Sequence, residues 1–380
     1  MKYVTDVKQS MRLQRPIRVL IQAALPLALF CLYVVSPAPA MAQVSGTVAR
    51  SGLINPHAIL FSPSTAKVYS VDSAHNQVII SNDAKGTIAR VTVGSSPVSI
   101  AVDRISGKVY VANSGDGTVS VLDGVTDALL ATIPVGANPY SIAANAVTQK
   151  IFVSRTYSDL LTVIDARSNA VATYKIGAAD LLSVNTRTNQ VYAVGYEGGT
   201  VAVLNLQSGA VRKQSVGMHA WGLALDEASG TLYAAKTGDA QIAALHIATN
   251  TLTTMPTGAI PCALAIDTAR HEIYVVDYGD NTVTALNSLS GRRVATIPVG
   301  KSPEAIALDP TRHLVFIANT HGNTVSVLDE ISHRVIATIK TSEAPYGLAL
   351  NPVSGKLHVA TLSDLAFSII DTDAIHLPAR

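Results

Sequence analysis

The feature that most constrains the fold of this chain is a repeat that runs through most of its length. Aligned on the residue that closes each unit, successive units end 40–42 residues apart. The closing residues are Gly94, Gly136, Gly177, Gly217, Gly258, Gly300 and Ser342. A fixed period of this size is typical of repeat architectures in which each unit is one supersecondary structure that packs against its neighbours.

Each unit contains four short runs rich in Val, Ile, Ala, Tyr and Thr, separated by Gly, Asn, Asp, Ser or Pro. Such runs predict strands joined by tight turns. The third run ends on an Asn or Asp that we expect to bond the amides of its own turn. These residues are Asn82, Asp123, Asp165, Asn205, Asn287, Asp329 and Asp371. Four-stranded units of this length predict an all-β chain folded as a β-propeller.

The count of units predicts about eight four-stranded blades. The repeats span about residues 53–94, 95–136, 137–177, 178–217, 218–258, 259–300, 301–342 and 343–373. The last unit has three strand candidates, whereas the run from Val44 to Arg50 has no unit of its own. We expect this N-terminal run to complete the last blade and close the ring, which leaves few exposed sheet edges. Seven blades with one displaced unit are the alternative.

Three units share a motif that identifies a resemblance. V-Y-V-A-N at 109–113, I-Y-V-V-D at 273–277 and V-F-I-A-N at 315–319 are each followed by Gly-containing turns, T-V and an A-T-I-P-V-G-like run. The pattern resembles the YVTN-family, or YncE-like, β-propeller repeat across essentially the whole chain after residue 42. The third, fourth and fifth units depart from it, because they lack the closing Asn or Asp. The resemblance implies an exported bacterial propeller that acts as a binding or scaffolding module without a general catalytic signature.

The first 42 residues have the organisation of a secretory signal peptide. Five basic residues precede an apolar run over 19–35, and Ala40-Met41-Ala42 offers a cleavage site. Residues 43–380 then form a single propeller domain in the periplasm or outside the cell. An uncleaved anchor and a start at Met11 are the alternatives. Cys262 becomes the only cysteine of the exported chain, and we expect its thiol to be buried.

Composition excludes several classes of protein. The chain is 48% hydrophobic and 14% charged, which is too apolar for a disordered protein. Its formal charge of +2 becomes −2 once residues 1–42 are removed, because 23 basic and 25 acidic residues remain. Such a charge argues against nucleic-acid binding by bulk electrostatics. We expect a monomer without a stable membrane span in the mature chain, since a closed ring completes its own core.

One repeat position varies while the scaffold around it repeats. It follows the Pro that opens the first strand, and it holds His57, Val98, Tyr140, Leu181, Trp221, Cys262, Glu304 and Tyr346. The first strands line the channel of a propeller, so these side chains form a ring at its funnel-shaped mouth. We expect Tyr140, Trp221 and Tyr346 to provide aromatic contact with a partner, and His57 and Glu304 to orient it. Alternatively, these side chains only fill the mouth of the channel.

A second variable position closes the second strand of each unit. It holds Asp72, Asn113, Arg155, Gly195, Lys236, Asp277, Asn319 and Thr361. Arg155 and Lys236 introduce cations, and Tyr157, Tyr196 and Tyr278 follow in the next loops. This sector predicts a site for an anionic ligand, a peptide carboxylate or single-stranded nucleic acid. A solvated loop surface is the alternative interpretation.

The sequence favours a non-catalytic exported scaffold whose partner is a protein or peptide. It contains no G-x-S-x-G, Walker, H-E-x-x-H or C-x-x-C motif, so we assign no catalytic residue, metal or cofactor. A lactonase-like hydrolase with a channel-mouth metal is one alternative, for which His57, His219, Glu304 and Asp72 would be candidate ligands. A structural cell-envelope protein is another, and it would use the opposite face near His271, His313 and His333.

Overall fold

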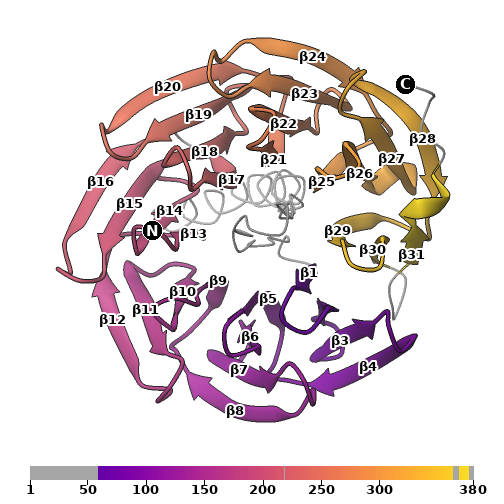
Figure 1. Cartoon of the computed structure of the whole chain (residues 1–380). Helices are drawn as coiled ribbons and strands as arrows, with labels where there is room; N and C mark the ends of the chain where they lie inside the picture. The colour runs from indigo at the N-terminus through magenta and orange to yellow at the C-terminus, as the bar shows by residue number, and fades with distance from the viewer. Residues whose placement is uncertain (1–58, 218, 363–367, 376–380) are drawn as a thin grey trace, which may run out of the picture.

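The computed structural model describes residues 59–217, 219–362 and 368–375. They form eight antiparallel sheets arranged as blades around a central axis (Figure 1). The all-β propeller with eight blades predicted from the repeat is therefore confirmed, and the seven-bladed alternative is wrong. Seven sheets have four strands in sequence order, and the eighth has three within the described residues.

The first four blades contain strands β1 to β16. Blade 1 is β1 (Ile59–Ser62), β2 (Lys67–Asp72), β3 (Gln77–Asn82) and β4 (Thr87–Thr92). Blade 2 is β5 (Pro97–Val102), β6 (Lys108–Asn113), β7 (Thr118–Asp123) and β8 (Leu129–Pro134). Blade 3 is β9 (Pro139–Asn145), β10 (Lys150–Arg155), β11 (Leu160–Asp165) and β12 (Val171–Lys175). Blade 4 is β13 (Leu181–Asn185), β14 (Gln190–Val194), β15 (Thr200–Asn205) and β16 (Val211–Ser215).

The remaining blades contain strands β17 to β31 and two short 3₁₀ turns. Blade 5 is β17 (Ala220–Asp226), β18 (Thr231–Lys236), β19 (Gln241–His246) and β20 (Thr251–Pro256). Blade 6 is β21 (Pro261–Asp267), β22 (Glu272–Asp277), β23 (Thr282–Asn287) and β24 (Arg293–Pro298). Blade 7 is β25 (Pro303–Asp309), β26 (Leu314–Asn319), η2 (Thr320–Gly322), β27 (Thr324–Asp329) and β28 (Arg334–Lys340). Blade 8 is β29 (Pro345–Asn351), β30 (Lys356–Thr361), β31 (Ser368–Asp371) and η3 (Thr372–Ala374).

Each blade runs from the axis outward. The first strand lies nearest the axis and the fourth forms the rim, as Figure 1 shows for β5 to β8. Strands one to three are buried along most of their length, because both faces of each sheet pack against neighbouring blades. Outer strands such as β8 and β24 are largely exposed. The core is therefore a series of apolar layers between blades, which is why apolar residues run almost continuously through the inner strands.

The second strand of every blade carries a large side chain at the same position. It is Tyr69, Tyr110, Phe152, Tyr192, Tyr233, Tyr274 and Phe316 in the first seven blades, and all seven side chains are buried. Burial of an aromatic side chain at a blade interface stabilises the fold by several kcal/mol, since truncating one costs about 3–5 kcal/mol. In blade 8 the equivalent residue is His358, which is also fully buried.

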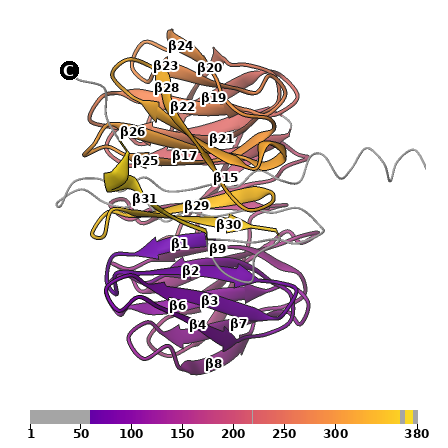
Figure 2. The same ribbon diagram turned by 90° about the vertical axis from the view of Figure 1, so that its right-hand side faces the viewer.

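The described residues of blades 1 and 8 pack against each other and close the ring. Val44–Arg50 lies outside the described residues, so its place in blade 8 stays a prediction. Strand β1 nevertheless packs beside β29, which Figure 2 shows at the junction of the two ends. One apolar cluster joins Ile59 of blade 1 to Tyr346 and Leu348 of blade 8.

A buried carboxylate also joins the two ends of the ring. Asp83, in the turn after β3, accepts hydrogen bonds from Asn351 Nδ2 and Ser354 Oγ, each at 2.6 Å. It also lies 3.0 Å from Nε2 of His358, and both side chains are at most 3% exposed. Burial alone would raise the pKa of Asp83, but the bonds from Ser354, His358 and Asn351 lower it below its usual value. His358 thus stands where the other blades have Tyr or Phe, and its imidazole pairs with this carboxylate.

The turns follow the chemistry expected of the repeat. The side-chain oxygen of Asp123 accepts the amides of Val125 and Thr126, and Asn205 does the same for Gln207 and Ser208. The predicted self-capping of the turn after the third strand is confirmed. The residue that closes the first strand behaves in the same way, as Asn185 shows with Arg187 and Thr188. Asn and Asp fit both positions because a short polar side chain reaches amides two or three residues ahead.

Candidate functional site

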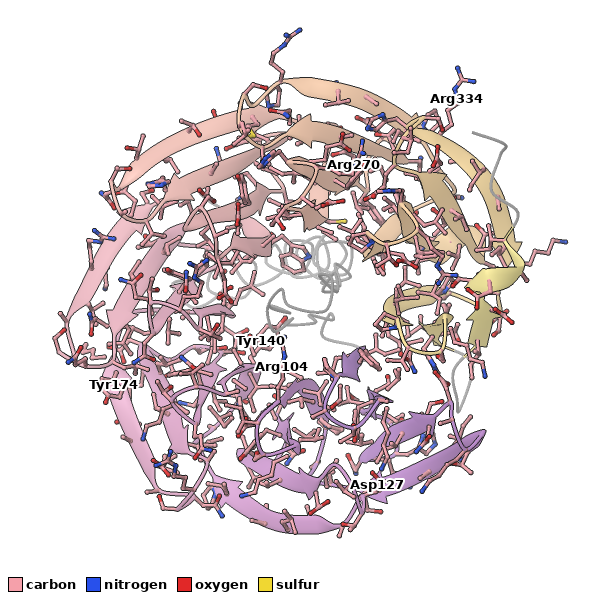
Figure 3. All side chains as sticks on the ribbon, viewed as in Figure 1. Arg104, Asp127, Tyr140, Tyr174, Arg270 and Arg334 are labelled. Atoms are coloured by element: carbon pink, nitrogen blue, oxygen red, sulfur yellow. The ribbon has the colours of Figure 1, made fainter. Side chains whose placement is uncertain are left out.

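The ring has two faces with different loops. We call the face with the links between blades and the loops between second and third strands the funnel face. The other carries the tight turns between strands one and two and between strands three and four, and we call it the turn face. Figure 3 shows Tyr140 and Arg104 toward the ring axis, whereas Tyr174 and Arg334 lie on outer strands.

The first variable ring lies mostly below the surface of the funnel face. Val98, Leu181, Trp221, Cys262, Glu304 and Tyr346 are buried, Tyr140 is half-buried, and His57 lies outside the described residues. The inner strands approach one another closely at the axis, so these side chains pack against neighbouring blades. Their burial matches the filling of the channel mouth that the sequence left open as the alternative.

Two buried members of this ring have distinct chemistry. Cys262 is 1% exposed, as predicted, and its Sγ lies 3.7 Å from the carbonyl oxygen of Pro303. Glu304 is 1% exposed, and burial raises the pKa of its carboxyl well above the usual value although the neighbouring Thr320 hydroxyl acts in the opposite direction. The Thr320 hydroxyl also donates to the carbonyl of Pro345 at 2.8 Å, which links blade 7 to blade 8.

Most members of the second ring are structural. Asn113 donates through Nδ2 to Thr118 and Ser120, and Asn319 makes the equivalent bonds to Thr324 and Ser326. The hydroxyls of Thr282 and Thr284 donate to the carboxylate of Asp277 instead. Burial raises the pKa of Asp277 to about 6, against the effect of these bonds. Each side chain thus ties the second strand of its blade to the third.

The side chains of the two predicted cations of this ring both contact neighbouring residues of their own loop. Lys236 is 9% exposed, and its ammonium lies 2.5 Å from the carboxylate of Asp239 in the following turn. Arg155 is half-buried, and its NH2 group donates to Ser158 Oγ at 3.1 Å. A Cβ at Gly136 would collide with the guanidinium of Arg155, so this glycine, at φ +93°, makes room for it. Arg155 is therefore the more accessible of the two cations.

Aromatic side chains gather on the funnel face where blades 4 and 5 meet. The rings of Tyr196 and Trp221 lie 4.8 Å apart in an edge-on arrangement, and Tyr196 lies 5.1 Å from the imidazole of His219. Tyr196 and His219 are half-buried, so one side of the cluster reaches solvent. The backbone supports it, because Asp180 accepts the Tyr196 amide at 2.8 Å and His219 N donates to the Tyr196 carbonyl.

Blade 3, which precedes blade 4 in the ring, carries an exposed aromatic residue on the same face. Tyr157 is 93% exposed, in the loop that follows Arg155. Its φ of +62° places a bulky residue in the left-handed region, which costs free energy for any residue with a Cβ. The same repeat position holds Gly115 in blade 2 and Gly279 in blade 6, so the exposed aromatic ring is particular to blade 3. Exposed tyrosines of this kind are common contact residues in protein interfaces.

The turn face contains a buried charged cluster that the sequence did not predict. Glu330 is fully buried, and its Oε2 lies 3.6 Å from Nδ1 of His313. Burial raises the pKa of Glu330 to about 9, with Asp267 and Glu272 adding to the effect and Arg270 opposing it. The repeat gave no signal for this cluster, because most units have no acidic residue at the positions of Glu272 and Glu330.

Glu272 in the same cluster has the opposite pKa shift. Burial would raise its pKa, but hydrogen bonds from His333 and Tyr274 and the nearby charges of His333 and Arg270 lower it to about 2. Tyr274 donates its hydroxyl to Glu272 Oε2 at 2.5 Å, and His333 Nε2 lies 3.2 Å away. Two neighbouring carboxyls are thus held in different protonation states at neutral pH. Their burial makes this arrangement a structural link between blades 6 and 7.

Charged residues also face each other at the turn-face end of the channel. Arg104 and Glu227 occupy the same repeat position in blades 2 and 5, and each influences the other electrostatically. Burial lowers the pKa of Arg104 to about 10, while Glu227 opposes that change. The Glu227 carboxylate accepts a hydrogen bond from Thr186 Oγ1 at 2.9 Å. Neither residue was a candidate from sequence, although both interrupt a ring of Pro, Thr and Ala.

A metal site needs several ligand side chains that converge on one point. In that part of the chain no three His, Cys, Asp or Glu side chains converge on one point. His219 and Glu304, two of the candidate ligands named from sequence, lie in blades 5 and 7. Among the same residues, no helix is long and apolar enough to cross a membrane.

Comparisons with known proteins agree with this architecture. No model of a known protein family matches the sequence, and curated protein sequences give no match. Among solved structures, dihydro-heme d1 dehydrogenase NirN in complex with DHE is similar, with a TM-score of 0.71 and 11% identity over 85% of this chain and 74% of that one. Sqt1 of Saccharomyces cerevisiae gives 0.66 and 12%, over 80% and 92% of the two chains.

A third similar structure is virginiamycin B lyase from Staphylococcus aureus. Its TM-score is 0.58 at 14% identity, over 70% of this chain and 92% of the lyase. The protein is therefore a β-propeller. The fold neighbours differ in function from one another, and a shared fold at this identity does not transfer an activity.

Proposed function

We propose that this protein is an exported, non-catalytic β-propeller that binds a protein or peptide through the funnel face of blades 3 to 5. The observation that carries the proposal is the exposure of Tyr157, held with a left-handed backbone beside a partly accessible arginine. Propellers commonly present binding residues on loops held by a rigid scaffold. The signal-like residues 1–42 support the proposed export, and the YVTN-family resemblance supports the same kind of role.

The proposed contact surface combines aromatic area with one cation. Tyr140, Tyr157, Tyr196 and His219 are exposed or half-buried, and Arg155 contributes a guanidinium. Tyrosine and arginine are enriched among the residues that dominate interface energies, because both combine large contact area with hydrogen-bonding groups. Lys236 is paired with Asp239, so we assign Arg155 the role of contacting a partner carboxylate. Trp221 supports Tyr196 from below.

The burial of Glu304 and Tyr346 limits what they can do in this proposal. A partner that stays on the surface would touch neither side chain, so their contribution would be to shape the channel wall. The proposed partner is a polypeptide because the candidate surface is spread over loops of three blades. We further propose that the protein acts as a monomer in the periplasm or outside the cell.

A selection of random peptides against the mature protein tests the proposal. Peptides that bind the wild type should lose affinity by about tenfold or more for Tyr157→Ala, since interface tyrosines contribute about 1–2 kcal/mol or more. Tyr196→Ala should reduce binding in the same direction. Tyr174→Ala is the matched control, because Tyr174 lies on the outer strand β12 of the same blade (Figure 3). Equal losses in Tyr157→Ala and Tyr174→Ala, or no peptide binding at all, would contradict the proposal.

A further inference from the structure

A pocket opens on the turn face where blades 4 and 5 meet. Its volume is about 440 Å³, within the range of small-molecule sites. Blade 4 contributes Tyr192, Val203, Asn205, Val211 and Arg212, and blade 5 contributes the turn that begins at Ile247. This pocket lies on the opposite side of the ring from the proposed partner surface.

At the seam that holds the pocket, the second strand contributes no lysine bridge of the kind seen at two other seams. In blade 1, Lys67 opens the second strand and donates to the carbonyl of Val125 in blade 2. Lys108 makes the equivalent bond from blade 2 to Ala166 in blade 3. Gln190 holds this position in blade 4, and its side-chain oxygen accepts hydrogen bonds from Tyr192 and Thr188 of the same blade. No long cation therefore extends from this position into the space between blades 4 and 5.

The walls of the pocket divide into an apolar part and a donor-rich part. Val203, Val211 and Ile247 provide aliphatic surface next to the phenol of Tyr192. Asn205 uses its side-chain oxygen for the amides of Gln207 and Ser208, so the group it can offer a ligand is its NH2. The pocket thus matches a compound with an apolar body and an acceptor-rich end.

Arg212 favours a negative charge on the acceptor-rich end of the ligand. Its NH2 group donates to the carbonyl of Ile247 at 2.7 Å, which fixes the guanidinium across the seam. A guanidinium has five donors, so further N–H groups remain for a ligand, and their planar arrangement suits a carboxylate. Arg212 is exposed on the outer strand, and the carboxylate Glu227 acts on Tyr192 from the inner turn of blade 5. An anionic group would therefore bind at the outer end of the pocket.

We propose that this pocket binds a small organic carboxylate, with its carboxyl group on Arg212 and its apolar body between Tyr192, Val203 and Ile247. Benzoate is a suitable probe, because it has one carboxylate and a compact apolar ring. Benzamide has the same shape without the charge, and acetate has the charge without the ring. Inorganic phosphate reports on binding of a simple anion.

Amide chemical shifts of the mature protein, titrated with each probe, test this proposal. We expect saturable shifts near Gly230 and Ala248 with benzoate, and affinity at least about tenfold weaker for benzamide, acetate and phosphate. Arg212→Gln should weaken benzoate binding about tenfold or more. Arg293→Gln is the matched control, because Arg293 on β24 also donates to backbone carbonyls of a neighbouring blade, at Pro256 and Thr257.

A second variant tests the space in the pocket and leaves the charge of Arg212 unchanged. Ala248→Phe should obstruct the pocket from its exposed rim and abolish benzoate binding while the far-UV circular dichroism stays unchanged. Four results would overturn the proposal. These are the absence of saturable shifts with benzoate, equal binding of benzoate and phosphate, equal effects of Arg212→Gln and Arg293→Gln, and full binding to folded Ala248→Phe. Peptide binding on the funnel face should be unaffected by Arg212→Gln, so this test and that of the proposed function fail independently.

Discussion

Replacing Asp83 with alanine tests how strongly one carboxylate holds the two ends of the ring together. The Asp83 side chain is 3% exposed and accepts bonds from Asn351, Ser354 and His358 of blade 8. Alanine leaves three donors without their acceptor, of which Asn351 and His358 are buried, and each buried group of this kind costs about 1–3 kcal/mol. The three share one partner, so their costs overlap. We expect the free energy of unfolding to fall by about 3–5 kcal/mol.

Urea unfolding at neutral pH, followed by circular dichroism, measures this loss. Asp123→Ala is the matched control, because Asp123 also accepts hydrogen bonds in the turn after a third strand, but only from Val125 and Thr126 of its own turn. That variant should lose about 0.5–1.5 kcal/mol. Similar losses in the two variants would refute the claim that Asp83 links the blades.

A double-mutant cycle examines the coupling of Asp83 to His358. At the seam between blades 1 and 2, the equivalent residues are Gly124 and Tyr69, and the Tyr69 hydroxyl donates to the Gly124 carbonyl at 3.1 Å. Asp83→Gly combined with His358→Tyr should therefore recover about 1 kcal/mol or more relative to the sum of the single changes. Strict additivity would show that the two residues act separately.

Two further predictions concern a buried carboxyl and a close backbone contact. Burial raises the pKa of Glu330 to about 9, so the folded protein keeps a proton that the unfolded chain releases, and stability falls by about 1.4 kcal/mol per unit as pH rises from about 4.5 toward 9. Glu330→Gln should flatten this slope in urea unfolding measured from about pH 5 to 8, and parallel slopes would contradict the assignment. A Cβ at Gly222 would lie 2.5 Å from the Cys262 carbonyl oxygen, whereas one at Gly198 meets nothing within 4 Å. Gly222→Ala should lower the melting temperature by several degrees, corresponding to about 1–3 kcal/mol, while Gly198→Ala leaves it nearly unchanged; equal melting temperatures would refute the contact.

The features predicted correctly from sequence are those that recur in every unit. Strand order and the self-capping of turns by residues such as Asp123 depend on contacts within one repeat. The same sequence pattern therefore recurs in each unit, and counting the units gives the number of blades. The buried Cys262 was also predicted, because an unpaired cysteine in an exported protein is usually inaccessible.

Features that depend on pairs of blades were much harder to predict. Asp83 and His358 meet only because the ring closes, and 275 residues separate them in sequence. The pocket at blades 4 and 5 depends on the direction that Gln190 takes, and its residue type does not fix that direction. Lys236 was predicted to contact an anionic ligand, and its pairing with Asp239, three residues further along the same turn, was missed.

Fluorescence of Trp221 provides the most direct test of partner binding at the funnel face. It is the only tryptophan of the chain, and its ring contacts Tyr196, whose exposed side belongs to the proposed surface. Titration with binding peptides should change its emission saturably, and Tyr196→Ala should remove most of that change. Single-stranded DNA and lactones serve as comparison ligands. Emission that stays constant while a peptide binds, or that responds to lactones instead, would contradict a peptide site beside blades 4 and 5.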